Sequence, residues 1–104
     1  VCSSDLIFGR KYPIWITEFG LQTPAPGVVR ATSYRGQAVF VRQAIAKLKR
    51  LPQVERAAWF LIKDDPPRNG HWYTTGLRKS SGAKKPSFGA WVQAAAKLRK
   101  SPIR

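Results

Sequence analysis

The stretch Pro13 to Gln22 reads PIWITEFGLQ and contains the most strand-like run of the 104-residue chain. Apolar residues stand on both alternations of this run, which predicts a strand from about Ile14 to Phe19. Such a pattern is typical of a parallel strand that is covered on both faces. Glu18 stands at the end of the run, although the chain has only five acidic residues. Because a buried carboxylate is costly unless it is paired or used, Glu18 is a candidate functional residue.

A helix, a second strand and a second helix are predicted after this run. Ser33 can cap a helix over 34–51, whose apolar residues recur on one face and which Pro52 ends. Residues 54–62, VERAAWFLI, predict a second strand, and a further helix begins near Pro86. Two parallel strands joined by a helix form a βαβ unit, whose crossover should be right-handed. Because two strands alone leave sheet faces and edges bare, we expect the chain to be a section of something larger.

The first six residues, VCSSDL, have an unusual sequence. They correspond to a translation of GTG TGC TCT TCC GAT CTN, which resembles the tail of a widely used sequencing adapter. We therefore expect residues 1–6 to be an artefact and the natural protein to begin near Ile7. Cys2, the only cysteine, then belongs to the artefact, so no disulfide or thiol chemistry is inferred from it. The alternative is an ordinary N-terminus with a chance match.

The composition of the chain is strongly basic, with 19 Lys and Arg and a formal net charge of +14. Such a charge suggests nucleic acid or an anionic surface, so a small basic nucleic-acid-binding protein is the alternative function. However, many basic residues stand at polar helix positions or in the tail, and they form no known nucleic-acid module. Most aromatic residues lie in apolar runs rather than among the basic ones. No apolar run approaches the roughly 20 residues that would span a bilayer, which excludes a membrane-spanning protein.

Three motifs in order resemble the last two strand–helix units of cellulase-like glycoside hydrolases of clan A. They are PIWITEFG at 13–20, AAWFLIKDD at 57–65 and TGLRKSSGAKKPSFGAW at 75–91. These enzymes are TIM (β/α)8 barrels, and the resemblance covers about residues 11–95. It implies an α/β fold in which residues 7–104 form the seventh strand to the eighth helix of a barrel, with parallel strands and a crossover helix. The remaining barrel strands would then be partners from the parent chain.

Glu18 has a specific counterpart in that family. The glutamate that ends strand seven is the catalytic nucleophile, and Glu18 matches it by position. The carboxyl ends of barrel strands form the face on which such enzymes build their sites. For a lone Glu, a salt-bridged or helix-facing structural role would be the alternative.

Retaining hydrolysis also needs a second carboxyl group, about 5 Å from the first. In the family this group ends strand four, which this chain does not contain. The resemblance therefore implies a fragment of a retaining β-glycoside hydrolase that carries the nucleophile but lacks the general acid/base. It would act on O-glycosidic bonds of a polysaccharide or oligosaccharide without a cofactor or metal. The sequence leaves open whether the substrate is cellulose, mannan, xylan or a fungal glucan, and whether the parent is secreted.

Five further residues are predicted to contact substrate. Trp59 matches a tryptophan that in the family often stacks beneath the sugar at the cleavage point, and core packing is the alternative. Asp64 is expected to cap its loop or to contact substrate. His71, Trp72 and Tyr73, on the following loop, could line outer sugar subsites. A carbohydrate-binding module that uses such aromatic residues is less consistent with two predicted helices, because those modules are usually β-sandwiches.

Overall fold

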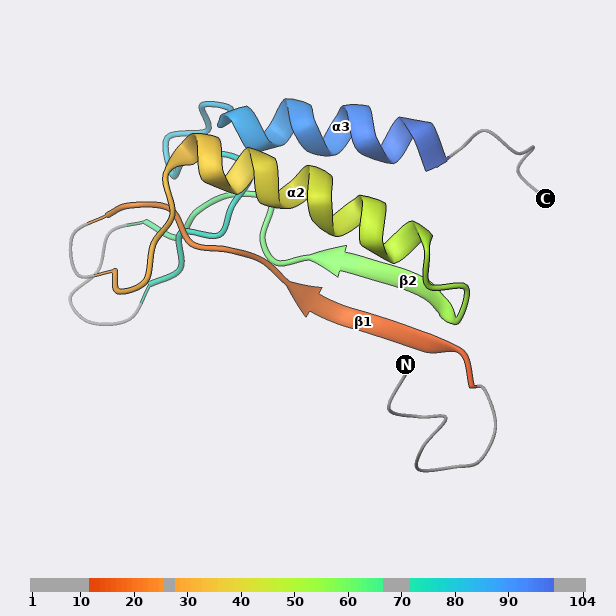
Figure 1. The fold of residues 1–104 in the computed structure, drawn as a ribbon. Coiled ribbons are helices and arrows are strands. Elements are labelled where there is room, and N and C mark those ends of the chain that lie inside the picture. Colours follow the sequence, from red (N-terminus) through yellow and green to blue (C-terminus); the bar gives the residue numbers. More distant parts are fainter. Residues whose placement is uncertain (1–11, 26–27, 67–71, 99–104) are drawn as a thin grey trace.

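The computed structural model of the protein describes residues 12–25, 28–66 and 72–98 (Figure 1). The elements follow in the order β1 (Ile14–Phe19), α2 (Tyr34–Lys49), β2 (Val54–Trp59) and α3 (Pro86–Leu98). β1 and β2 are parallel neighbours, and both helices lie on one face of the two-stranded sheet (Figure 1). The predicted order and the parallel pairing are therefore confirmed. Residues 1–6 lie outside the described parts of the chain.

The helix α2 begins and ends through local interactions. The side-chain oxygen of Ser33 accepts a hydrogen bond of 2.9 Å from the backbone N–H of Gly36, which confirms the predicted cap. The helix ends at Lys49, two residues earlier than expected, and the N–H of Arg50 bonds to the carbonyls of the last turn. Pro52 lies just beyond this cap and cannot continue the helix.

The core between the sheet and the helices is small. Its buried apolar residues come from both helices and from the segment before α3: Ala38, Val41, Ile45, Leu77 and Ala90. Trp59 extends this core, because its ring centroid lies 5.3 Å from that of Phe19, 6.0 Å from that of Phe40 and 6.0 Å from that of Trp91. The three partners come from β1, α2 and α3, so one tryptophan joins three elements.

The predicted end of the second strand needs correction. β2 ends at Trp59 instead of residue 62, and isolated bridges follow in the described residues, between Lys63 and Arg78 and between Arg78 and Lys84. β1 has the apolar pattern of a strand covered on both faces, but in this chain no residue of it is fully buried, and Trp15 is 60% exposed. The guanidinium carbon of Arg56 lies 4.8 Å from the centre of the Trp15 ring on this open face. The helices cover only the other face, which explains the difference.

None of the helices in the described ranges is both long and apolar enough to cross a membrane.

Between Arg78 and α3 the chain makes a turn, in which the N–H of Gly82 donates to the carbonyl of Lys79 at 2.8 Å. Gly82 has a φ of +94°, a conformation that side chains with a Cβ atom rarely adopt. This turn sets the start of α3, whose N-terminal residues matter for the site.

Candidate active site

A β-bulge in β1 lies beside Glu18. Ile16 pairs with Ala57 and Phe19 pairs with Trp59, so β1 advances three residues where β2 advances two. Such an inserted residue bends the strand and turns the neighbouring side chains. The exposure pattern agrees, because Thr17 and Glu18 are both exposed while the residues on either side of them are partly buried.

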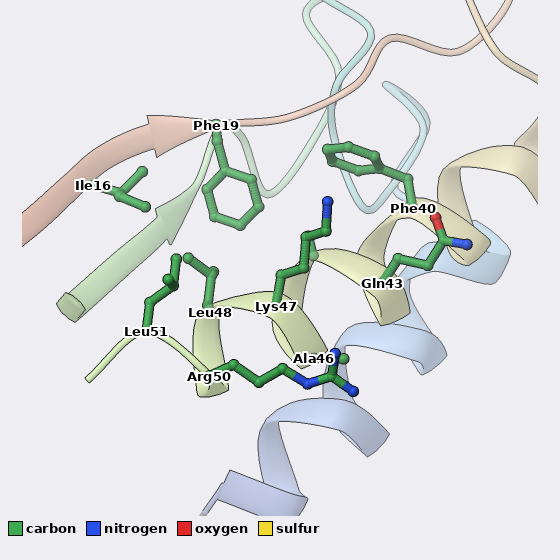
Figure 2. A pocket seen from close by; sticks show the side chains of 10 residues that line it. Ile16, Phe19, Phe40, Gln43, Ala46, Lys47, Leu48, Arg50 and Leu51 are labelled. Atoms are coloured by element: carbon green, nitrogen blue, oxygen red, sulfur yellow. The ribbon is translucent and has the colours of Figure 1, made fainter. Parts of the chain in front are cut away.

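The bulge determines which face of the sheet carries the Glu18 side chain. Ile16 and Phe19 both line a groove with α2, so both point toward the helices (Figure 2). In a regular strand, Glu18 would share a face with Ile16, because side chains alternate with a period of two. With the extra residue, Phe19 takes the helix-facing position and Glu18 remains exposed. Glu18 therefore lies near the carboxyl end of β1, and no ion pair to it is found among the described residues.

Trp59 lies in different surroundings from Glu18. Its ring packs against Phe19, Phe40 and Trp91 on the helix side of the sheet, and its indole N–H donates to the carbonyl of Thr75 at 2.7 Å. These contacts match the core-packing alternative. Trp59 is only partly buried, and its sugar-stacking role stays a prediction.

Asp64 has a structural role in this fold. It is buried, and its Oδ1 atom accepts hydrogen bonds from the Lys85 ammonium at 2.7 Å and from the Gly76 N–H at 2.8 Å. Of the two predicted roles, loop capping fits these bonds and the buried ion pair with Lys85, while the substrate contact stays a prediction. The neighbouring Asp65 accepts a hydrogen bond from the N–H of Tyr73 at 3.0 Å, so both aspartates bond to backbone N–H groups further along the chain.

The aromatic residues after β2 lie partly at the surface. Tyr73 is 52% exposed, and its ring makes an edge contact with Phe60 at a centroid distance of 5.3 Å. The N–H of Phe60 donates to the carbonyl of Phe19 at 2.8 Å, so this aromatic pair lies beside the end of β1. Trp72 is half-buried, and His71 lies outside the described residues. The sequence analysis missed Phe60, although its place directly after Trp59 could have indicated it.

A buried lysine joins the loops that follow the two strands. The Lys85 ammonium donates to Thr23 Oγ1 at 2.9 Å, to Asp64 Oδ1 at 2.7 Å and to the Thr74 carbonyl at 3.1 Å. Burial lowers the pKa of Lys85, and the hydrogen bond and charge of Asp64 act in the opposite direction. The sequence analysis included Lys85 only as part of the motif at 75–91 and did not assign it a partner.

A buried glutamine on α2 adds to these contacts. Gln37 is fully buried, and its amide nitrogen lies 2.9 Å from the Leu21 carbonyl, 3.3 Å from that of Thr75 and 3.4 Å from that of Gly76. Its side-chain oxygen accepts a hydrogen bond of 2.7 Å from Ser87 Oγ. The sequence analysis also missed this residue. The signal was a polar residue four positions before Val41, on the apolar face of the helix.

A groove of about 720 Å3 lies between β1 and α2, on the helix side of the sheet, and its lining is mainly apolar (Figure 2). The residues that line it include Ile16, Phe19, Phe40, Leu48 and Leu51. Within the described ranges, no three His, Cys, Asp or Glu side chains gather into a possible metal site.

Comparison with known proteins identifies the family. The family described as "Glycosyl hydrolase catalytic core" matches residues 5–91. Among solved structures, a β-glucuronidase from Faecalibacterium prausnitzii has a TM-score of 0.75 at 18% identity, over 97% of this chain and 18% of its own. A GH5_18 protein from Streptomyces cattleya, in complex with GlcNAc, has a TM-score of 0.67 at 25% identity, over 88% of this chain and 21% of its own.

A third similar structure has the highest identity of the three. It is a GH128 endo-β-1,3-glucanase from Amycolatopsis mediterranei in complex with laminarihexaose, with a TM-score of 0.56 at 32% identity. The match covers 76% of this chain and 30% of that protein. This chain thus spans less than a third of each of these three proteins, and no curated protein matches it. The α/β fold with parallel strands matches that of TIM-barrel glycosidases. Because the family match extends over most of its length, the chain belongs to the glycosyl hydrolase catalytic core family.

Proposed function

We propose that this chain is the C-terminal part of a retaining β-glycoside hydrolase barrel and that Glu18 is its nucleophile. The bulge in β1 carries this proposal, because it leaves the Glu18 carboxylate exposed near the carboxyl end of a parallel strand. Catalytic residues of TIM barrels come from this end of the strands. Membership of a glycosyl hydrolase family supports the same role.

The chemistry assigned to Glu18 is nucleophilic substitution at the anomeric carbon. Its carboxylate forms a bond to that carbon while the bond to the leaving oxygen breaks and a second carboxyl group protonates that oxygen. The same second group then takes a proton from water, which hydrolyses the glycosyl-enzyme and frees Glu18. We assign the second carboxyl group to the part of the barrel that precedes this chain. The isolated chain is therefore expected to be inactive.

The groove between β1 and α2 supports the view that further barrel elements adjoin this chain. It exposes apolar side chains along the free edge of β1, where a preceding strand–helix unit of a barrel would pack. The similar structures are also longer, since the matched part of this chain spans only 18–30% of each of them. Residues 1–6 remain outside the proposed barrel portion.

The substrate we propose is a β-linked saccharide. The similar GH128 endo-β-1,3-glucanase holds laminarihexaose, which favours a β-glucan among the possibilities. Tyr73 and Trp72 are proposed to contact outer sugar units, and the same role for His71 stays a prediction. The packing of Phe19, Phe40, Trp59 and Trp91 against one another leaves these rings no platform for bases, which counts against the nucleic-acid alternative.

The experiment is substitution of Glu18 in the full-length enzyme, once the upstream reading frame has been recovered. Glu18→Ala is expected to abolish hydrolysis of aryl β-glycosides and β-glucans, and azide is expected to restore part of the activity with formation of a glycosyl azide of inverted configuration. Glu18→Gln should be inactive as well, because an amide keeps the shape but lacks the nucleophilic charge. Glu55→Ala is the matched control, since Glu55 is also an exposed glutamate in a strand. Wild-type rates in either Glu18 variant would refute the proposed role.

A further inference from the structure

We propose that Lys85 is a positioning residue for Glu18. It lies at the centre of a group of polar side chains, here called the polar clamp, that joins the loop after β1 to the loop after β2 and to the start of α3. The polar clamp consists of Thr23, Gln37, Asp64, Thr74, Lys85 and Ser87. The inference rests on the proposed function, because it assigns Lys85 a part in the same reaction.

The Lys85 ammonium contacts both strand-end loops directly. It donates to Thr23, five residues after Glu18, and to Asp64, five residues after the end of β2. Its third hydrogen bond goes to the Thr74 carbonyl, further along the second loop. An ammonium has three N–H groups, so its donors are all used. No donor is left for a different task.

The two loops are also bonded to each other at this point. The N–H and Oγ1 of Thr23 both donate to the Thr74 carbonyl, at 3.1 and 3.0 Å, and Thr74 Oγ1 donates to the Thr23 carbonyl at 2.7 Å. Both threonines are about 1% exposed. Lys85 thus bonds to a pair of loops that already hold each other, and it adds α3 to them.

Only a few residues of the chain separate Glu18 from the nearest contacts of the polar clamp. The carbonyl of Leu21, only three residues after Glu18, accepts a hydrogen bond of 2.9 Å from Gln37. Gln37 is held in turn by Ser87, two residues after Lys85. Leu21 and Thr23 are therefore both fixed by buried side chains that belong to the helices or to the segment leading into α3.

Fixing this segment matters for nucleophilic attack. The reacting atoms must lie about 3–3.5 Å apart and in line, and a misplacement of about 1 Å can reduce the rate about 100-fold. The bulge leaves Glu18 on a locally disrupted part of the ladder, so the strand pairing alone holds it less firmly. The clamp provides the missing constraint immediately after the bulge.

The chain contains a matched control for Lys85. The adjacent Lys84 is exposed, and its ammonium lies 4.9 Å from the centre of the Phe88 ring rather than in the clamp. Lys85→Met removes the ammonium and keeps a long side chain. Lys84→Met makes the same chemical change one residue away, outside the buried network.

The test measures kcat per competent active site in the full-length enzyme. A 2-deoxy-2-fluoro glycoside that traps the glycosyl-enzyme counts the competent sites, so loss of folded protein does not affect the result. Lys85→Met is expected to lower kcat per trapped site by about 10- to 100-fold with a smaller change in KM, because geometry rather than binding is lost. Lys84→Met is expected to stay within about twofold of the wild type, since it leaves the clamp intact.

A second pair of variants decides the question if Lys85→Met does not fold. Thr23→Val removes the hydroxyl that joins Lys85 to the first loop at nearly constant volume, and Thr23→Ser retains it. Thr23→Val is expected to lower kcat per trapped site about 3- to 10-fold. Thr23→Ser, which keeps the hydroxyl, is expected to retain most of the wild-type kcat per trapped site. Unchanged kcat per trapped site in Lys85→Met, or in Thr23→Val where Lys85→Met does not fold, would overturn the positioning role. Retained activity in Glu18→Ala, or trapping at another residue, would instead refute the proposed function.

Discussion

Gly76 shows how closely the buried loop is packed at the scale of a single residue. A Cβ atom at this position would lie 2.5 Å from the Lys63 carbonyl carbon and 2.7 Å from the Arg78 carbonyl oxygen, and it would also meet the backbone nitrogen of Asp64. These neighbours are backbone atoms held by the hydrogen bond from Asp64 N–H to the Arg78 carbonyl, at 2.9 Å. They cannot move aside without breaking that bond.

Gly76→Ala is therefore expected to destabilise the fold by about 1–3 kcal/mol, the usual cost of overpacking. Gly89→Ala is the matched control, because a Cβ atom there meets nothing within 4 Å. Gly89 lies within α3, so alanine should stabilise the helix by up to about 1 kcal/mol. Thermal unfolding midpoints of the full-length enzyme measure both effects. A Gly76→Ala protein as stable as the wild type would contradict the tight packing described here.

Single residues also show where sequence analysis succeeds and fails. Glu18 could be singled out because a carboxylate at the end of an apolar run is unusual, and its motif added a role. Lys85 could not be assigned to Asp64, because the two are 21 residues apart and basic residues are common in this chain. The contact between them arises only when the loop after β2 folds back toward the start of α3.

Ser33 determines where α2 begins, at the scale of an element. Its side chain accepts from the N–H of Gly36, one of the N–H groups that a helix start leaves without a partner. The first turn of α2 contains no acidic residue that could interact with the helix dipole. The cap is therefore expected to contribute more here than in a helix with acidic residues at its start.

Ser33→Ala is expected to destabilise the protein by about 1 kcal/mol, because the N–H of Gly36 loses its partner. Ser33→Asp should keep the wild-type stability, since aspartate is an equally good cap and adds a negative charge at the helix start. Thermal or urea unfolding of the two variants beside the wild type gives the comparison. Equal stability of Ser33→Ala and wild type would mean that the cap bond contributes nothing measurable.

The helices and strands themselves were largely predictable, but the face of the sheet on which each side chain lies was not. Apolar periodicity, a serine cap and a following proline are local features, and they correctly placed α2 to within two residues of its end. The bulge in β1 is a feature of pairing with β2, and no residue of PIWITEFG marks it. Alternation alone would therefore have assigned Glu18 to the wrong side of the sheet.

The molecule as a whole leaves apolar surface uncovered. The groove between β1 and α2 has a volume of about 720 Å3, and Trp15 is exposed on the opposite face of the sheet. Large exposed apolar patches usually mark interaction sites or promote aggregation. In the proposed barrel, neighbouring strands and helices would cover both surfaces.

The isolated chain is accordingly expected to bind a hydrophobic dye and to self-associate at micromolar concentration. Leu51→Gln should reduce dye fluorescence, because Leu51 lines the groove. Val29→Gln serves as the control, since Val29 is 75% exposed and does not line that groove. A soluble monomer with a sharp, cooperative thermal transition would instead indicate a complete small domain and count against the barrel proposal.

The amino-acid sequence alone determined the order of elements, the parallel pairing and the family, because these follow from local periodicity, caps, breakers and short motifs. Only the tertiary structure decided that Glu18 is exposed, that Trp59 packs against aromatic residues of three elements and that Asp64 is held by Lys85. The physical reason is that each of these outcomes depends on strand register or on contacts between segments distant in the chain. A one-residue shift in register reverses the face of every side chain that follows, and local sequence does not record it.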